Sequence, residues 1–297
     1  MRILIVFVFL YSGLVLCEQK DLYKKASELI DQKNYEQAYV VLNQLTAKNS
    51  KDVKAYELIA RMYKDMGGTE NVKIAEAYYY RIFKEDQSNT KIEMELGACA
   101  YLLGHREKAR MIFDDVKETD PKIKKLNYYL GALAFDKGHA AVAREYLKKE
   151  IALYGGDAVT LFMLGATYEY NSDGKRIRDA SGIEESIKYY KEAIKLDPEA
   201  VNALMNLSID YSLKKDQDKA IQTAEKILKI KGSDNVKYVV YYNLACFYSL
   251  KKDTKNAIDN LKKAMTAGFD DLKHMKEDKD LDNIRDTKEY KELIRSN

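Results

Sequence analysis

Few residues in this sequence could carry out chemistry by themselves. The histidines are His105, His139 and His274, and the first two stand 34 residues apart. Two histidines can bind a metal ion, but 34 residues is also the length of one helix–turn–helix repeat. That spacing places both side chains at the same turn of neighbouring copies. We therefore expect surface turn residues here, with no bound metal and no cofactor.

Sequence motifs for catalysis are missing. The chain has no His-Glu-x-x-His motif, no phosphate-binding loop and no Gly-x-Ser-x-Gly nucleophile motif. Asn171 to Gly174 begins like a calcium loop, yet the twelfth loop position is Ala180, where a bidentate Glu is required. We expect a protein that is not an enzyme. An unusual active site in the 169–185 segment is the alternative.

The N-terminal segment predicts export. Met1 and Arg2 precede an apolar run over 3–16, which Cys17 ends. One positive charge before a run of this length fits a secretory signal and is short for a membrane span. Leu14-Val15-Leu16-Cys17 resembles the lipobox of bacterial lipoproteins, although a small residue is usual in place of Leu16. The resemblance implies that segment 1–17 is a signal and that Cys17 is lipidated.

Two alternatives remain for this segment: cleavage after Cys17 with plain secretion, or an uncleaved anchor. The expected location is the bacterial cell envelope, lipid-anchored in the periplasm or at the outer membrane. The other two cysteines, Cys99 and Cys246, lie on helix faces that we expect to pack. They are predicted to be buried free thiols, with no disulfide.

Composition favours helices and argues against nucleic-acid binding. The 297 residues include only two prolines, and the 50 Lys and Arg nearly balance the 47 Asp and Glu, giving a net charge of +3. The two signs are interleaved along the chain and do not form the basic stripe that is typical of nucleic-acid binders. We expect a protein or peptide partner, with no nucleic acid and no small-molecule substrate.

Small residues recur at two registers along the chain. Each register contains only Gly, Ala or Ser: Ala26, Ala60, Gly97, Gly131, Gly165, Ser208 and Ala245 in one, and Ala38, Ala75, Ala109, Ala143, Ser186, Ala220 and Ala257 in the other. A small side chain allows two helices to approach to about 8 Å. The pairs are 12 residues apart in five copies, 15 in the second and 21 in the fifth. We expect the added residues to lie in turns, which tolerate insertions.

Large residues accompany these registers. Leu precedes the first small residue at 96, 130, 164, 207 and 244, and Tyr follows three residues after it at 63, 168, 211 and 248. Gly104 and Gly138 would end first helices. This combination resembles the tetratricopeptide repeat. The resemblance implies an all-α, right-handed α-solenoid of about seven helix–turn–helix repeats whose first helices line a concave face.

The expected domains follow from the registers. The array covers 18–271, with repeats at about 19–52, 53–89, 90–123, 124–157, 158–200, 201–234 and 238–271. Residues 272–297 differ in pattern and are predicted to form a C-terminal helical cap, because the last repeat of an array otherwise leaves an apolar face exposed.

In such repeats the groove is lined by positions two, three and six before the first small residue and one after it. The predicted peptide-binding residues are Tyr128, Tyr129, Phe162, Met163, Asn202, Met205, Asn206, Tyr242 and Asn243. Tyr and Met suit peptide binding, and Asn can pair with a peptide backbone. The alternative for each is packing within its own repeat.

These expectations combine into a non-enzymatic scaffold or adaptor of the cell envelope that binds a peptide segment or a partner helix. Two alternatives remain open: a self-associating structural solenoid in an envelope, pilus or secretion assembly, and a regulator of a cell-envelope enzyme.

Overall fold

The computed structural model describes residues 19–171, 175–176 and 180–295. Within these ranges the chain is helical, and the only β-type pairing is an isolated bridge between Tyr170 and Arg176. The expected all-α fold of helix–turn–helix repeats is confirmed. Cys17 and the rest of the segment 1–18 lie outside the described residues.

The chain forms two compact units, Met1–Leu130 and Gly131–Asn297. The first contains a helix over 19–31, α2 (Tyr35–Lys48), α3 (Val53–Met66), α4 (Thr69–Glu85), α5 (Thr90–Leu102) and α6 (Arg106–Thr119). The boundary falls inside α7 (Leu126–Asp136). The second contains α8 (Ala140–Tyr154), α9 (Ala158–Tyr168), α10 (Ala180–Leu196), α11 (Val201–Leu213), α12 (Gln217–Ile227), α13 (Lys237–Leu250) and α14 (Thr254–Thr266). It ends with α15 (Leu272–Glu277), α16 (Asp282–Arg285) and α17 (Lys288–Arg295).

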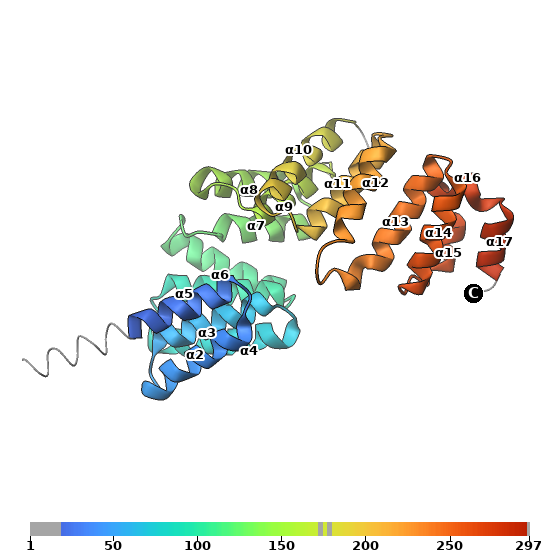
Figure 1. Ribbon diagram of the computed structural model, residues 1–297. Coiled ribbons are helices and arrows are strands. Elements are labelled where there is room, and N and C mark those ends of the chain that lie inside the picture. Colours follow the sequence, from blue (N-terminus) through green and yellow to red (C-terminus); the bar gives the residue numbers. More distant parts are fainter. Residues whose placement is uncertain (1–18, 172–174, 177–179, 296–297) are drawn as a thin grey trace, which may run out of the picture. The chain divides into compact units, whose positions relative to one another are not determined.

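Neighbouring helices pair as hairpins (Figure 1), as in α3 with α4 and α13 with α14. Some helix starts carry side-chain caps: Asp52 and Asn89 accept hydrogen bonds from backbone N–H groups of the first turn. Gly104 and Gly138 follow the ends of α5 and α7 with φ of +81° and +80°. A left-handed backbone favours glycine, so these residues allow the chain to reverse into the second helix.

All fourteen residues of the two small registers are buried. The three glycines face the large residue four positions after the second small residue. A Cβ on Gly97 would lie 2.5 Å from Phe113 Cε1, on Gly131 3.1 Å from Leu147 Cγ, and on Gly165 2.8 Å from Tyr190 Cε1. The glycines therefore lie at equivalent helix crossings, as the spacing predicted.

The length differences between copies lie in turns. The longer second copy reverses at Gly67 and Gly68, both with positive φ, between α3 and α4. The longest addition falls between α9 and α10, and the last one contains a short 3-10 helix, η1 (Asp234–Val236), before α13. Helix pairing is thus unaffected by chain length, because each addition leaves both small registers in place.

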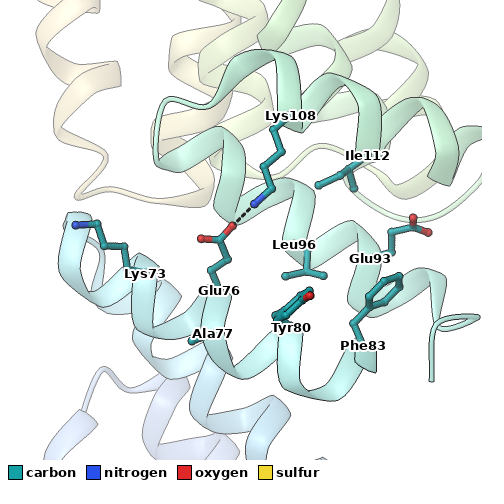
Figure 2. A pocket seen from close by; sticks show the side chains of 9 residues that line it. All are labelled: Lys73, Glu76, Ala77, Tyr80, Phe83, Glu93, Leu96, Lys108 and Ile112. Carbon is teal, nitrogen blue, oxygen red and sulfur yellow. Dashed lines mark hydrogen bonds and ion pairs between the residues drawn. The ribbon is translucent and has the colours of Figure 1, made fainter. Parts of the chain in front are cut away.

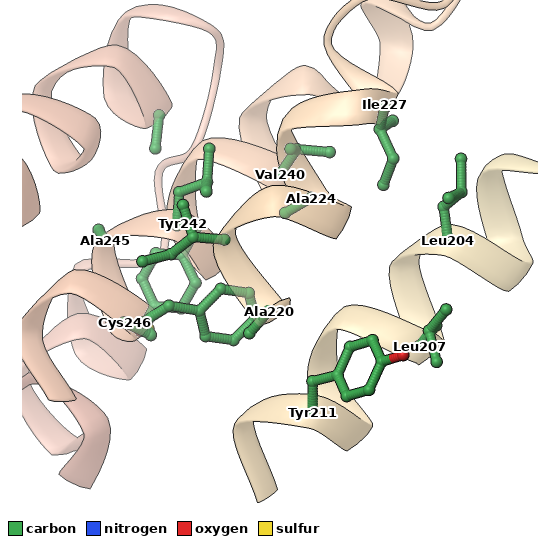
Figure 3. Packing of buried hydrophobic residues seen from close by; sticks show 14 of the residues in the cluster. Leu204, Leu207, Tyr211, Ala220, Ala224, Ile227, Val240, Tyr242, Ala245 and Cys246 are labelled. Carbon is green, nitrogen blue, oxygen red and sulfur yellow. The ribbon is translucent and has the colours of Figure 1, made fainter. Parts of the chain in front are cut away.

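The core of the second unit runs from α9 to the C-terminal helices. Figure 3 shows part of it, where α11, α12 and α13 present Leu, Ile, Val, Ala and Tyr side chains to one another. Met275, Leu281, Ile284 and Tyr290 continue this cluster and are buried. The tail therefore covers apolar surface of α13 and α14. Among the described residues, no helix combines the length and apolar character needed to cross a bilayer.

Candidate peptide-binding surface

A cavity of about 450 Å³ lies on the first-helix side of the second unit. Its walls come from α11, α13 and α15, together with the segment that follows α15. The lining side chains are Arg176, Ile209, Ser212, Leu213, Tyr242, Asn243, Cys246, Phe247, His274, Glu277, Asp278, Lys279 and Asp280. Five of these side chains, on α11 and α13, are aliphatic, aromatic or thiol groups, and the other eight are polar or charged.

Asp278 connects several polar groups of the cavity through hydrogen bonds. Its Oδ2 accepts a hydrogen bond from the Tyr242 hydroxyl at 2.6 Å and one from the Cys246 thiol, with Sγ at 3.6 Å. The His274 Nε2 lies 3.7 Å from the same oxygen. The Oδ1 atom accepts the backbone N–H of Asp280 at 3.0 Å and starts a short 3-10 helix, η2 (Lys279–Leu281). This carboxylate is thus fixed by neutral donors on two elements.

Burial favours the protonated forms of the Cys246 thiol and the Tyr242 hydroxyl at the cavity wall. The pKa of the Cys246 thiol is raised well above its ordinary value, chiefly by burial and also by the Asp278 charge. The pKa of Tyr242 is raised for the same leading reason. Since the thiolate is the reactive form of cysteine, a neutral buried thiol is inert. Cys99 is buried too, and burial raises its pKa to about 12.

Two of the nine predicted groove residues line this cavity, Tyr242 and Asn243. Tyr242 is only 5% exposed and stacks on Phe269, with ring centroids 4.2 Å apart. Asn243 is half-buried, and its Nδ2 lies 3.4 Å from the Met205 sulfur. Tyr242 is therefore a buried part of the cavity wall, and the contacting side chains of Asn243 and Met205 lie beside it.

Phe162 and Asn206 contact Tyr190, which belongs to a polar network with Glu169 and Arg176. Phe162 stacks on Tyr190 at 5.8 Å, and the Asn206 amide donates to the Tyr190 hydroxyl at 3.2 Å. That hydroxyl donates in turn to Glu169, which also pairs with Arg176. The structure thus engages both predicted residues in internal contacts, and both side chains are half-buried.

The other predicted residues are distributed over both units. Met163 is half-buried and Asn202 is exposed, both in the second unit. Tyr128 and Tyr129 belong to the first unit, where Tyr129 stacks on Phe113 at 5.1 Å. Tyr129 also lines a cavity of about 610 Å³ between α3, α5 and the start of α7. The binding role of all nine residues stays a prediction.

The first unit has a further cavity on its second-helix side, of about 460 Å³. Figure 2 shows Tyr80 and Phe83 of α4 turned toward Leu96 and Ile112, with an ion pair between Lys108 and Glu76 at the rim. Tyr80 is 52% exposed. This cavity lies away from the predicted groove positions, and its charged rim is balanced.

Sequence reasoning missed several cavity residues. Ile209 and Cys246 directly follow the first small residue of their copies, so the same register rule would have found them. Glu277 and Asp278 belong to the tail, which carries no repeat register. His105 and His139, expected at surface turns, are exposed and precede α6 and α8.

Comparison with known proteins identifies the repeat. Two family models described as Tetratricopeptide repeat match residues 176–235 and 238–267. No curated protein matches the sequence significantly. Repeats of this family generally mediate protein–protein interaction.

Solved structures share the fold at low identity. The APC/C hetero-tetramer Cut9–Hcn1 is 17% identical with a TM-score of 0.68, covering 88% of this chain and 48% of that chain. A monomeric mutant of IFIT1 with m7Gppp-AAAA is 15% identical with a TM-score of 0.69, covering 84% and 59%. A tetratricopeptide repeat protein from Parabacteroides merdae is 15% identical with a TM-score of 0.51, covering 90% and 98%.

The chain spans about half of the Cut9–Hcn1 chain that it matches, and these identities speak for the fold alone. The family matches, the buried small registers and the helical hairpins agree with one another. The protein is therefore an all-α chain of helix–turn–helix units, in which residues 176–235 and 238–267 match the tetratricopeptide repeat.

Proposed function

We propose that this protein is an exported, non-enzymatic scaffold of the bacterial cell envelope that binds a peptide segment or partner helix on its first-helix side. The observation that carries the proposal is the cavity between α11, α13 and α15, where apolar side chains of α11 and α13 lie beside polar and charged groups. Binding of this kind draws its affinity from a few buried anchors, with polar contacts setting the register.

The apolar wall supplies the anchor site. Ile209 is half-buried and Leu213 is 36% exposed, and both face the cavity from α11. Covering such side chains with a partner residue is worth about 25 cal/mol for each Å² removed from water. The amide of Asn243 stands at the same wall and can meet a peptide backbone.

A cross-linking experiment tests the site. One variant carries a photoreactive amino acid in place of Leu213, and the control variant carries it in place of Val142, which is 44% exposed on the second-helix side in α8. Both variants are cross-linked in the native envelope. We expect a captured protein at position 213 and none at 142. The captured partner, once purified, should then bind Leu213→Asp about tenfold or more weakly than the parent protein, and Val142→Asp equally well. Equal binding by all three proteins would contradict the site.

The proposed location depends on Cys17. Lipidation of this thiol would hold the repeats at a membrane surface, leaving their helices in the aqueous compartment. Metabolic labelling with a radioactive fatty acid should mark the parent protein and leave Cys17→Ala unlabelled. An exported but unlabelled parent protein would instead support plain secretion.

A further inference from the structure

We propose that the cavity between α11, α13 and α15 receives the lysine or arginine side chain of a bound peptide. The inference rests on the proposed function and specifies its ligand: a segment with one basic residue beside an apolar one. It follows from the charge, the hydrogen bonding and the shape of the cavity.

The charge of the walls favours a cation. Glu277, Asp278 and Asp280 line the cavity together with Lys279 and Arg176, and His274 adds a positive charge only when it is protonated. The charge of Arg176 is offset by its ion pair with the buried carboxylate of Glu169. The surrounding segment 270–286 contains seven Asp and Glu and four Lys and Arg, a net charge of −3. Opposite charge near the cavity would strengthen the approach and binding of a basic group.

The fixed carboxylate of Asp278 is the source of this field inside the cavity. Its side chain is only 17% exposed, and its oxygens accept bonds from a hydroxyl, a thiol and a backbone N–H. These three donors are neutral and hold the carboxylate in place without cancelling its charge, whereas His274 Nε2, 3.7 Å from Oδ2, offsets that charge only when protonated. A negative charge in a half-dry site acts over a longer range than one on open surface.

The rim supplies the direct partner. Because both Asp278 oxygens already accept hydrogen bonds, an incoming ammonium or guanidinium group would pair first with Glu277, which is exposed at the cavity edge. The alkyl stem of the incoming lysine or arginine would lie against Ile209, Leu213 and Phe247. Lysine and arginine have this combination of apolar stem and charged head.

Matched fluorescent nonapeptides test the inference on the full chain purified in detergent. One set has a central lysine between leucine and serine residues. The other has Nε-acetyl-lysine at that position, which keeps the alkyl stem but removes the side-chain charge. We expect the lysine peptides to bind about tenfold more tightly, with the difference shrinking at high salt. Equal affinity of the two sets would overturn the inference and leave the proposed function standing.

Paired substitutions locate the site. Glu277→Gln with Asp280→Asn should weaken the lysine peptides about fivefold and leave the acetylated peptides unchanged, since each exposed pair contributes modestly. Asp259→Asn with Glu289→Gln is the control, because both carboxylates are exposed and lie outside the cavity. Equal losses in the two double variants would overturn the assignment. If no peptide of either set bound, the inference would be overturned, and capture of a partner at position 213 would decide the proposed function separately.

Discussion

Gly97→Leu is expected to lower the free energy of unfolding by at least about 3 kcal/mol. Gly97 lies in α5 where α6 crosses it, and a single added Cβ would already come within 2.5 Å of Phe113 Cε1. Phe113 is fully buried and its other contacts include the ring of Tyr129, so it has no open space to enter. Overpacking of a filled core typically costs about 1–3 kcal/mol, and a whole leucine side chain exceeds the usual case.

Urea unfolding followed by circular dichroism measures the effect, and two smaller changes identify its cause. Gly97→Ala should cost less, because alanine regains about 1 kcal/mol of helix propensity. Adding Phe113→Leu to Gly97→Ala should recover stability, since leucine already fills the equivalent place at Leu147, where a Cβ on Gly131 would be 3.1 Å away. If Gly97→Leu unfolded at the same urea concentration as the parent protein, the close crossing would be contradicted.

The helix crossings could be predicted because their physical requirement is visible in single residues. A close approach excludes large side chains, so Gly97, Gly131 and Gly165 stand out at one spacing, and the structure places each against a large residue of the paired helix. Turn lengths could be predicted by the same logic, since only the residues between small registers vary. In the second copy, the turn that contains the additional residues includes Gly67 and Gly68, both with positive φ.

The candidate site could be predicted only in part, because its residues follow two different rules. Asn243 stands at a groove position of its repeat and lies at the cavity wall. The partner of Tyr242, however, is Asp278, which lies 36 residues away in the tail. The tail is not a copy of the repeat, so no register connects it to α13. The tail side chains reach the cavity only because the tail folds against α13, and the repeat spacing does not predict that contact.

Asp210→Asn is expected to remove a pH dependence of stability that the parent protein shows between about pH 4 and pH 7. Asp210 lies in α11, is 1% exposed, and is bonded to the Ser186 hydroxyl of α10. Burial raises the pKa of this carboxyl from 3.8 to about 7, while the Ser186 hydrogen bond lowers it, Glu169 raises it and Arg176 lowers it. The folded state thus holds a proton that the unfolded chain releases at lower pH.

The sign of the effect follows from proton linkage. Below about pH 4 both states carry the proton, and the contribution of Asp210 to stability is complete. Between about pH 4 and pH 7 only the folded state carries it, so stability falls as pH rises, and above about pH 7 the loss is complete. The interval between 3.8 and about 7 corresponds to no more than about 4 kcal/mol. Asparagine resembles the protonated acid, and its amide can donate to Ser186 at every pH.

Urea titrations of both proteins from pH 4 to pH 8 measure this contribution as a difference. Other carboxyls with raised pKa values, such as Asp65 and Glu93, belong to the first unit and titrate in both proteins alike, so they cancel. The two stability curves should lie close together at pH 4 and separate by a few kcal/mol at pH 8, with Asp210→Asn the more stable. Parallel curves would mean that Asp210 is ionised in the folded protein throughout this range. In that case the Ser186 hydroxyl of α10 would donate its hydrogen bond to a charged carboxylate of α11.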